Sequence, residues 1–283
     1  MMAALRGDEQ RIIFSQLCNV LDPRAAVAFG SASSELRALT QADRQQLSAD
    51  YEAATALGHK AGKGSCKELR EAKAVGWHYA GLSFDDLALL GTLGSVLPEL
   101  EELYLYEAAA GPDGVRRLAE KLGAGALPAV TLLELNGTQV GDAGASALAA
   151  ALDRGALPRL ESLYLGGTAI GDAGLVALAP ALRRLPALVG LGLSRNPLGD
   201  DGLAALVAPP PPPAGAPPPA TGVLTKLKQL YLGRTDITDA GCAALAAALN
   251  SGALPALECL FLMGVPASVA ARSAVFVARA GIQ

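Results

Sequence analysis

The chain has 283 residues, of which 51% are hydrophobic, only 4% are aromatic and 18% are charged. Its 23 basic and 27 acidic side chains nearly cancel, and no basic stripe of the kind that binds nucleic acid is present. The longest uncharged stretch, between Asp201 and Lys226, is rich in proline and cannot form a membrane helix. The start of the chain lacks an apolar signal-peptide core, so we expect a protein of the cytoplasm or the nucleus, with no nucleic-acid or membrane partner.

The cysteines and histidines offer no sign of a metal site, a disulfide framework or a cofactor. The four cysteines are scattered without a Cys-x-x-Cys pair, which predicts reduced thiols. His59 and His78 have no acidic or cysteine partner at ligand spacing, so neither a metal ligand nor a general base is expected. We therefore expect a protein that is not an enzyme and has no cofactor.

Residues 1–57 are expected to form a helical segment. Residues 11–21 have an apolar face at helical spacing and are followed by Asp22-Pro23, which predicts the end of a first helix. A second helix is expected over residues 24–29 and a third around residues 36–39.

This segment is similar to an F-box, a helical module that docks a substrate receptor onto the adaptor of a cullin-type ubiquitin ligase. The similar residues are Ile13, Phe14, Leu17, Leu21, Asp22, Pro23, Arg24, Ala26, Ser31, Ser33, Leu36 and Arg37. The resemblance implies that Phe14, Leu17, Leu21, Asp22 and Pro23 contact such an adaptor. The Leu-Pro that usually opens an F-box is replaced by residues 7–9, and the alternative interpretation is a helical cap that shields the first repeat.

Residues 58–96 are predicted to contain a linker and a degenerate capping repeat. Residues 58–65 superficially resemble a phosphate loop, but Ser or Thr does not follow the lysine directly and no strand precedes, so a flexible linker is expected. The capping repeat is expected over residues 69–97, with Leu82, Leu87 and Leu90 buried.

From residue 97 onward one pattern recurs, and it determines the predicted architecture. Equivalent leucines lie 28 to 30 residues apart, except for one spacing of 39, at Leu103, Leu133, Leu163, Leu191, Leu230 and Leu260. Around each of them Leu-x-x-Leu-x-Leu alternates as a short strand requires, and an Ala/Leu-rich helix follows. An aspartate stands at the start of each of these helices, where we expect it to act as an N-cap, at Asp142, Asp172, Asp200 and Asp239.

The repeats resemble those of leucine-rich repeat proteins of the ribonuclease-inhibitor type. The resemblance implies an α/β solenoid over residues 97–283, with a curved parallel sheet inside and helices outside, preceded by the small helical segment. Asparagine occupies the turn position after the strand only at Asn196, and threonine replaces it at Thr138, Thr168 and Thr235. Residues 267–280, with Val269, Phe276 and Val277, are expected to cover the far end of the array.

Two features are candidates for binding. The proline-rich insertion at residues 208–222 favours an extended left-handed helix, which an aromatic groove could recognise or which is simply a tolerated insertion. On the exposed strand face, aromatic and arginine side chains gather at equivalent positions, as a binding surface would require. The alternative explanation is that tyrosine favours strands whether or not it binds a partner. The predicted partner-binding residues are Tyr104, Tyr106, Glu134, Tyr164, Arg195, Tyr231, Arg234 and Phe261, with Gly192 offering room for an incoming side chain.

The function expected from these features is a protein–protein interaction scaffold that binds its partner on the concave face. The F-box resemblance makes the specific expectation a substrate receptor of a cullin-type ubiquitin ligase. The alternative is a regulator of small GTPases, because Ran GTPase-activating proteins share this type of repeat, although the acidic tail that those proteins often carry is missing here.

Overall fold

The computed structural model describes residues 7–78, 80–106, 111–208, 224–279 and 281–282. It divides into a helical unit, comprising residues up to Ala72 together with Val96–Glu99, and a repeat unit, comprising Lys73–Ser95 and the chain from Leu100 onward. The proline-rich insertion lies almost entirely outside the described residues. None of the helices in the described part of the chain combines the length and the apolar composition needed to cross a membrane.

Within the residues that the structure describes, the helical unit contains five helices. They are α1 (Gly7–Leu17), α2 (Arg24–Gly30), α3 (Ser34–Leu39), α4 (Gln41–Lys60) and α5 (Cys66–Arg70). The first helix ends four residues earlier than the expected Leu21, because the side chain of Asn19 accepts a hydrogen bond from the backbone N–H of Leu21 (2.9 Å) and forms a turn there. Helix α4 runs through Gly58 to Lys60, so the segment predicted as a linker begins inside a helix.

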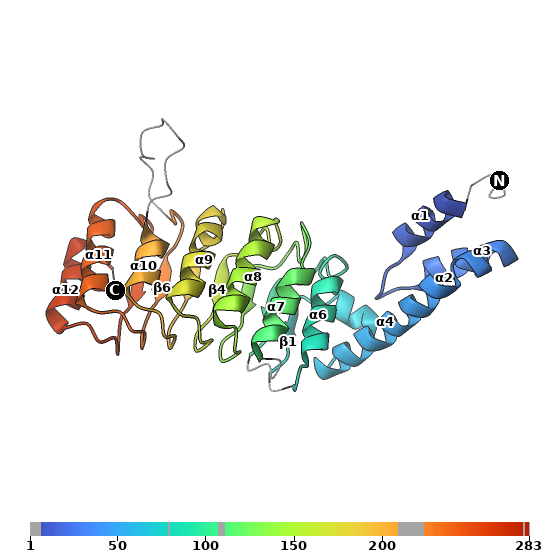
Figure 1. Ribbon diagram of the computed structural model, residues 1–283, viewed down its shortest axis with the longest axis horizontal. Helices are drawn as coiled ribbons and strands as arrows, with labels where there is room; N and C mark the ends of the chain where they lie inside the picture. Colours follow the sequence, from blue (N-terminus) through green and yellow to red (C-terminus); the bar gives the residue numbers. More distant parts are fainter. Residues whose placement is uncertain (1–6, 79, 107–110, 209–223, 280, 283) are drawn as a thin grey trace, which may run out of the picture. The chain divides into compact units, whose positions relative to one another are not determined.

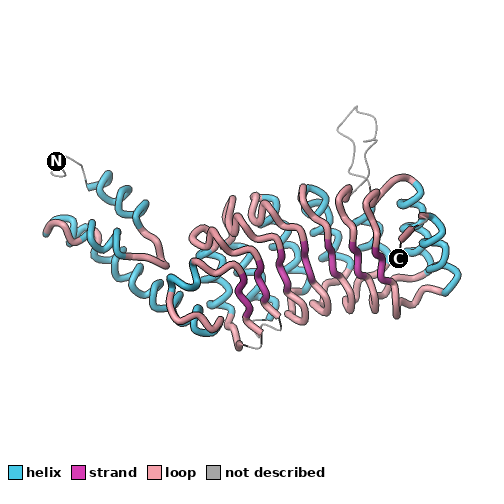
Figure 2. The backbone as a smooth tube through the Cα atoms, turned by 180° about the vertical axis from the view of Figure 1, so that it is seen from behind, coloured by secondary structure: helices cyan, strands magenta, loops and turns pink. Residues whose placement is uncertain are grey.

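The repeat unit is a parallel sheet of seven three-residue strands, each followed by a helix. The strands are β1 (Ala74–Gly76), β2 (Glu102–Tyr104), β3 (Leu132–Glu134), β4 (Ser162–Tyr164), β5 (Gly190–Gly192), β6 (Gln229–Tyr231) and β7 (Cys259–Phe261), and they pair in chain order. The helices are α6 (Phe84–Leu93), α7 (Gly111–Lys121), α8 (Gly141–Asp153), α9 (Asp172–Arg184), α10 (Asp200–Val207), α11 (Asp239–Asn250) and α12 (Val269–Ala278). Figure 1 shows these helices in a row along one side, and Figure 2 shows the strands side by side on the other.

The core of the repeat unit lies between the strands and the helices. The central residues of consecutive strands pair with one another, from Val75 with Leu103 to Leu230 with Leu260, and all of them are buried. Leu82, Leu87 and Leu90 are also buried, and β1 pairs with β2, so β1 and α6 form the first strand and helix of the repeat unit. The α/β leucine-rich repeat solenoid predicted from the sequence is thus the observed fold.

The aspartates at the helix starts do not cap their own helices, as the sequence had suggested. Asp172 is the first residue of α9, and its Oδ1 accepts hydrogen bonds from the backbone N–H groups of Gly199 (2.7 Å) and Gly202 (2.9 Å) in the next repeat. The same link to the next repeat joins Asp142 to Gly171, Asp200 to Thr238 and Asp239 to Ser268. Each carboxylate therefore satisfies free N–H groups at the start of the following helix and fastens two repeats together.

Asn196 makes a second link between repeats. Its Oδ1 accepts from the backbone N–H groups of Thr168 and Ile170 (both 3.0 Å), and its Nδ2 donates to the carbonyl oxygens of Leu165 (2.7 Å) and Leu193 (2.9 Å). The threonine hydroxyls at this position each donate to a backbone carbonyl: Thr138 to Leu105, Thr168 to Leu165 and Thr235 to Leu232. Asparagine thus satisfies more buried backbone groups than threonine does.

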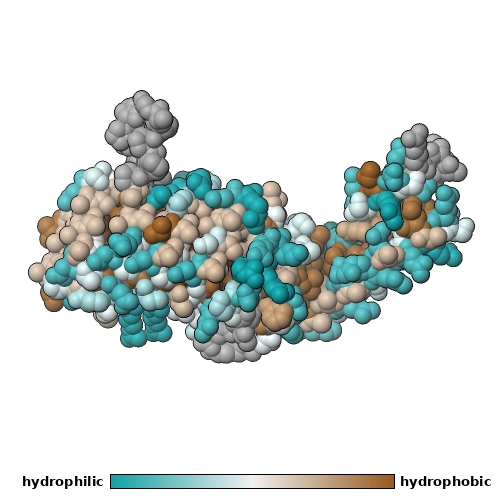
Figure 3. All heavy atoms as spheres, in the orientation of Figure 1, coloured by the Kyte–Doolittle hydropathy of each residue, from teal (hydrophilic) through white to brown (hydrophobic). Residues whose placement is uncertain are grey.

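Of the three residues expected to cover the far end of the array, only Phe276 is partly buried. Val275 is fully buried, whereas Val269 and Val277 are 71% and 81% exposed. The helix side of the repeat unit, seen in Figure 3, shows scattered hydrophilic and weakly hydrophobic residues, as its alanine-rich sequences dictate.

Candidate functional site

The strand side chains that alternate with the buried leucines form one row across the sheet. The register pairs Tyr104 with Glu134, Glu134 with Tyr164, Tyr164 with Gly192, Gly192 with Tyr231, and Tyr231 with Phe261. The structure therefore confirms the predicted alignment of these residues, and we call the surface that they form the concave face. Because adjacent hydrogen-bonded strands lie about 5 Å apart, neighbouring members of the row are separated by about the same distance.

Gly192 does not leave the room that the sequence suggested. A Cβ atom at this position would lie 2.7 Å from Cδ1 of Tyr164, so the ring of Tyr164 already covers the glycine. The absence of a side chain on β5 lets the tyrosine ring lie across the neighbouring strand. The space that the sequence assigned to an incoming side chain is filled from within the chain.

Both acidic residues near the start of the row have partners in the chain. Glu102 accepts a hydrogen bond from the hydroxyl of Tyr104 (2.8 Å), which raises the pKa of that phenol. Glu134 accepts from Nδ2 of Asn136 (2.8 Å), and Oδ1 of Asn136 in turn accepts from the backbone N–H of Gly166 (2.6 Å). These carboxylates therefore orient neighbouring polar groups.

A hollow of about 710 Å³ lies in the middle and C-terminal part of the concave face. It is lined by Tyr106, Asn136, Gly137, Tyr164, Gly166, Gly167, Gly192, Ser194, Arg195, Tyr231 and Phe261. The structure thus brings together five of the predicted binding residues, namely Tyr106, Tyr164, Arg195, Tyr231 and Phe261. Tyr104, Glu134 and Arg234 lie outside this lining. The volume is within the range of sites that bind small molecules or parts of a protein chain.

The hydroxyl of Tyr231 in the hollow stays protonated at ordinary pH. Burial is the main cause that raises the pKa of Tyr231, and the thiol of the neighbouring Cys259 adds to the effect. Phe261 is 41% exposed, and its ring fills the space above Gly233, where a Cβ atom would collide with it. The floor of the hollow can therefore offer aromatic rings and an uncharged hydroxyl to a ligand.

His78 extends the aromatic row by one repeat, although the sequence assigned it to the surface of the end cap. Its ring lies 6.0 Å from that of Tyr104 and 6.2 Å from that of Tyr106, between ring centroids. The alternation could have found it, because Gly76 pairs with Tyr104 and His78 stands two residues further along. Asn136 and Ser194 were missed for the same reason, since they lie one alternation beyond the strands.

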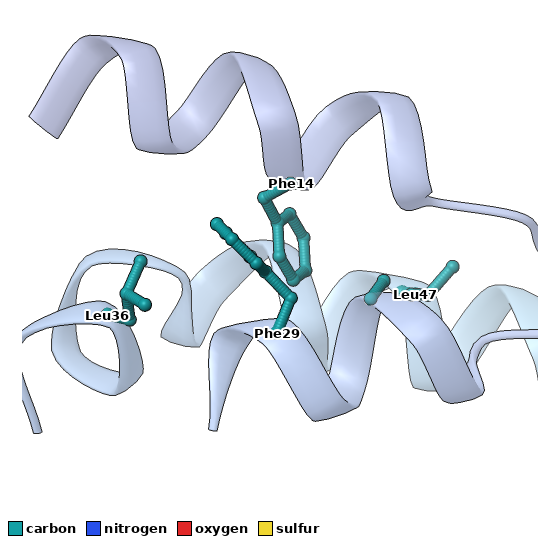
Figure 4. Close-up of a cluster of buried hydrophobic side chains, with 5 residues drawn as sticks. Phe14, Phe29, Leu36 and Leu47 are labelled. Carbon is teal, nitrogen blue, oxygen red and sulfur yellow. The ribbon is translucent and has the colours of Figure 1, made fainter. Parts of the chain in front are cut away.

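The residues expected to contact a ubiquitin-ligase adaptor are not all on the surface. Figure 4 shows Phe14 pointing from α1 toward Phe29, within a core that also contains Leu36 and Leu47. Phe14 is only 1% exposed and Leu21 only 4%. The apolar face of α1 therefore contributes to a core that it shares with residues of α2, α3 and α4.

The other predicted adaptor contacts are partly exposed. Asp22 forms an ion pair with Arg24 (2.7 Å), and this partner lowers the pKa of the carboxyl to about 2. Leu17 and Pro23 are half-buried. No cluster of three or more histidine, cysteine, aspartate or glutamate side chains that could hold a metal occurs among the residues that the structure describes.

Comparison with known families agrees with this geometry. A family model described as leucine-rich repeat matches residues 128–149, 157–179, 190–207 and 223–246. These segments follow four of the repeats that the structure shows, so the family model agrees with the leucine-rich repeat fold. No curated protein sequence gives a significant match.

Two solved structures illustrate how distant the similar proteins are. Internalin C2 from Listeria monocytogenes strain 4b F2365 has 19% sequence identity and a TM-score of 0.47, with 78% of each chain covered. The actin-binding site 2 of leiomodin-1 has 13% identity and a TM-score of 0.33, with 48% of this chain and 86% of that chain covered. Likenesses this distant indicate no function for the present chain.

Proposed function

We propose that the chain is a protein–protein interaction scaffold that binds its partner in the hollow of the concave face. The observation that carries this proposal is the register, which sets Tyr231 beside Phe261 and places Tyr164 in the same row, across Gly192. Tyrosine and arginine are the residues that most often dominate protein interfaces, and aromatic rings lose little conformational freedom when they are buried. The repeats hold these side chains on rigid strands, so little ordering is needed on binding.

The test compares single substitutions on the two sides of the solenoid. Partners of the full chain are captured from a lysate, identified by mass spectrometry, and the strongest is purified for titration. Tyr231→Ala should weaken its binding by about 2 kcal/mol or more, as hot-spot truncations do. Tyr164→Ala should weaken it similarly, with thermal unfolding measured in parallel because the ring of Tyr164 also packs on Gly192.

The control belongs on the outer helices. Arg154, which follows α8, and Arg183 on α9 are unsuitable because their guanidinium groups donate to backbone carbonyls of the neighbouring repeats. Val176 on α9 is 47% exposed, and Val176→Ala should leave binding unchanged. If Val176→Ala weakens binding while the tyrosine variants bind normally, the partner uses the helix side and the proposal is wrong.

A more specific role is that of a substrate receptor of a cullin-type ubiquitin ligase. It is supported by the order of the chain, with an F-box-like helical unit before the repeats. Since Leu21 belongs to the core, the informative changes are at exposed apolar residues, Ile12→Ser (57% exposed) and Val27→Ser (44% exposed). Co-purification of a ligase adaptor with the unchanged chain, and its loss in these variants, is the expected result. Recovery of a small GTPase instead of an adaptor would favour the alternative role.

The repeat subtype and the compartment belong to the same proposal. The outer helices α7 to α11 have 8 to 13 residues each. This length supports the ribonuclease-inhibitor type over types with shorter outer segments. The free thiols of Cys18, Cys66, Cys242 and Cys259 support a reducing compartment, the cytoplasm or the nucleus.

A further inference from the structure

Two arginines beside the hollow have a backbone conformation that ordinarily selects glycine. Arg195 and Arg234 have φ angles of 59° and 57°, in the left-handed region. The equivalent position in three other repeats is glycine with φ between 66° and 79°, at Gly137, Gly167 and Gly264. A Cβ atom makes the left-handed conformation less stable. The backbone is therefore strained at the two positions where arginine replaces glycine.

Among the described residues, four of the five other non-glycine residues with a left-handed backbone have an architectural explanation, which Ala169 (φ 58°) does not share. Leu127, Leu157, Leu224 and Leu254 all have φ near 52° and recur at one position, at the turn before each strand. Since leucine recurs there in four repeats, that conformation belongs to the repeat itself. Arginine at the Gly137-equivalent position is, by contrast, specific to two neighbouring repeats.

Neither guanidinium group is engaged by the protein. Within the described chain, Arg195 and Arg234 form no ion pair and donate no side-chain hydrogen bond, and both are exposed. Most other arginines of the repeat unit donate to protein oxygens, namely Arg116, Arg117, Arg154, Arg183, Arg184 and Arg279. The five donors of each free guanidinium group are therefore available to a ligand.

The backbone hydrogen bonds place the two arginines next to each other. The N–H of Arg195 donates to the carbonyl of Gly233 (2.8 Å), and the N–H of Arg234 donates to the carbonyl of Met263 (2.9 Å). They occupy successive steps of one ladder, with a backbone separation of about 5 Å. Arg195 lines the hollow together with Tyr231 and Phe261, so two positive charges adjoin an aromatic floor.

The charges of the concave face are also segregated along the solenoid. Glu102 and Glu134 lie on β2 and β3 and are held by Tyr104 and Asn136. The free positive charges come after β5 and β6, beyond the acidic strands. A ligand that covers the hollow therefore meets unpaired positive charge at its C-terminal side.

We propose that the hollow binds an acidic, extended segment of the partner protein, with two carboxylates held by Arg195 and Arg234 and an apolar side chain packed on Tyr231 and Phe261. This proposal rests on the proposed function and specifies the chemistry of the partner. Planar guanidinium groups bind carboxylates through paired hydrogen bonds, and a tandem of arginines suits neighbouring or alternate acidic residues. From Tyr106, just after β2, to Phe261 on β7 the hollow crosses five strand spacings, about 24 Å, which an extended segment of about seven residues spans.

The experiment selects ligands without assuming their sequence. Random peptides displayed on phage, long enough to cross the hollow, are selected against the full chain, and the enriched peptides are synthesised for fluorescence titration. The expected peptides carry at least two acidic residues beside an apolar or aromatic one. Their affinity should fall by about tenfold in the double variant Arg195→Gln/Arg234→Gln, the loss expected for two partly exposed ion pairs. It should also fall as salt is raised, because the charges are screened.

Two control variants separate charge from structure. Arg159→Gln removes an exposed arginine outside the lining of the hollow and should leave peptide binding unchanged. Arg195→Gly/Arg234→Gly restores the residue that the left-handed backbone favours, so binding should be lost while the melting temperature stays the same or rises. A loss of binding in this variant therefore cannot result from unfolding.

The outcomes distinguish this proposal from the proposed function. Enriched peptides that are neutral or basic, acidic peptides that bind the double glutamine variant equally well, or no enrichment at all would each overturn the acidic-segment proposal. If the natural partner still depends on Tyr231 but not on the two arginines, the concave face is the binding surface and only the acidic ligand is wrong. If it depends on none of them, both proposals fail.

Discussion

Replacing Gly202 by alanine tests the links between repeats, because two effects of opposite sign meet at this position. Gly202 is the third residue of helix α10, and alanine in a helix is ordinarily more stable than glycine by about 1 kcal/mol. A Cβ atom at this position would lie 2.7 Å from Oδ1 of Asp172, which is closer than real Cβ contacts. The carboxylate of Asp172 must then withdraw from the start of α10.

The cost of that withdrawal follows from the bonds that it breaks. Asp172 accepts from the N–H groups of Gly199 and Gly202, and hydrogen bonds to a charged group contribute about 1.5–3 kcal/mol each. With partial relaxation and the gain in helix propensity, we expect Gly202→Ala to lower the free energy of unfolding by about 2–4 kcal/mol. Helix propensity alone would instead predict that Gly202→Ala raises the free energy of unfolding.

A double-mutant cycle makes the reasoning refutable. Asp172→Ala alone should destabilise the protein, but adding Gly202→Ala to it should restore about 1 kcal/mol, because the collision no longer exists. Gly58→Ala in helix α4, where a Cβ atom meets only ordinary contacts of 3.7 Å or more, is the control and should be neutral or stabilising. Urea unfolding followed by far-ultraviolet circular dichroism gives each value. If Gly202→Ala stabilises the unchanged protein, the aspartates do not fasten the repeats.

Three further changes test other parts of the structure. Asn196→Ala should lower the free energy of unfolding by about 3 kcal/mol, because buried N–H groups lose their acceptor, whereas Thr235→Ala should cost about 1 kcal/mol in the same urea titration. Phe14→Ala should destabilise the helical unit by about 3–5 kcal/mol, and a small loss would mean that Phe14 is not a core residue. Since the pKa values of Tyr104 and Tyr231 are raised in the folded state, unfolding should become easier as pH rises above about 10, because the unfolded chain then loses these protons first. Tyr104→Phe should reduce this slope in alkaline unfolding curves, and an unchanged slope would contradict the assignment.

The sequence predicted the architecture of the repeat unit because each repeat packs against neighbouring repeats that have the same residue pattern. Once Leu133 is assigned to a buried strand, the equivalent leucines must follow, and the pairing of Leu133 with Leu163 is fixed by the repeat length. The row of exposed positions follows from the same register. This is why the alignment of Tyr164 and Tyr231 on one face, through the pairing of each with Gly192, could be derived without any structure.

Contacts between repeats were harder to predict, because they depend on neighbours that are not adjacent in the chain. Asp172 matched the signature of a helix N-cap, yet the structure gives its hydrogen bonds to Gly199 and Gly202. The glycine at the third position of α9, α10 and α11 (Gly174, Gly202 and Gly241) was the overlooked signal, since it leaves space for the aspartate of the preceding repeat. In the helical unit, an apolar stripe that includes Phe14 cannot by itself distinguish a docking surface from a core, and the burial of Phe14 decides it.

The neighbours across the strands also determine which part of the concave face is free to bind. Glu134 is held by Asn136, and the space above Gly192 is filled by the ring of Tyr164, so two positions that looked open in the sequence are already used. Arg195 and Arg234 are exposed and unengaged within the described chain, and they keep a backbone conformation that glycine would adopt at lower cost. A side chain that neither stabilises the fold nor suits its own backbone is best explained by what it binds. The part of this surface that we propose for the partner therefore lies around β5, β6 and β7, where the unengaged positive charge adjoins the exposed ring of Phe261 and the half-buried ring of Tyr231.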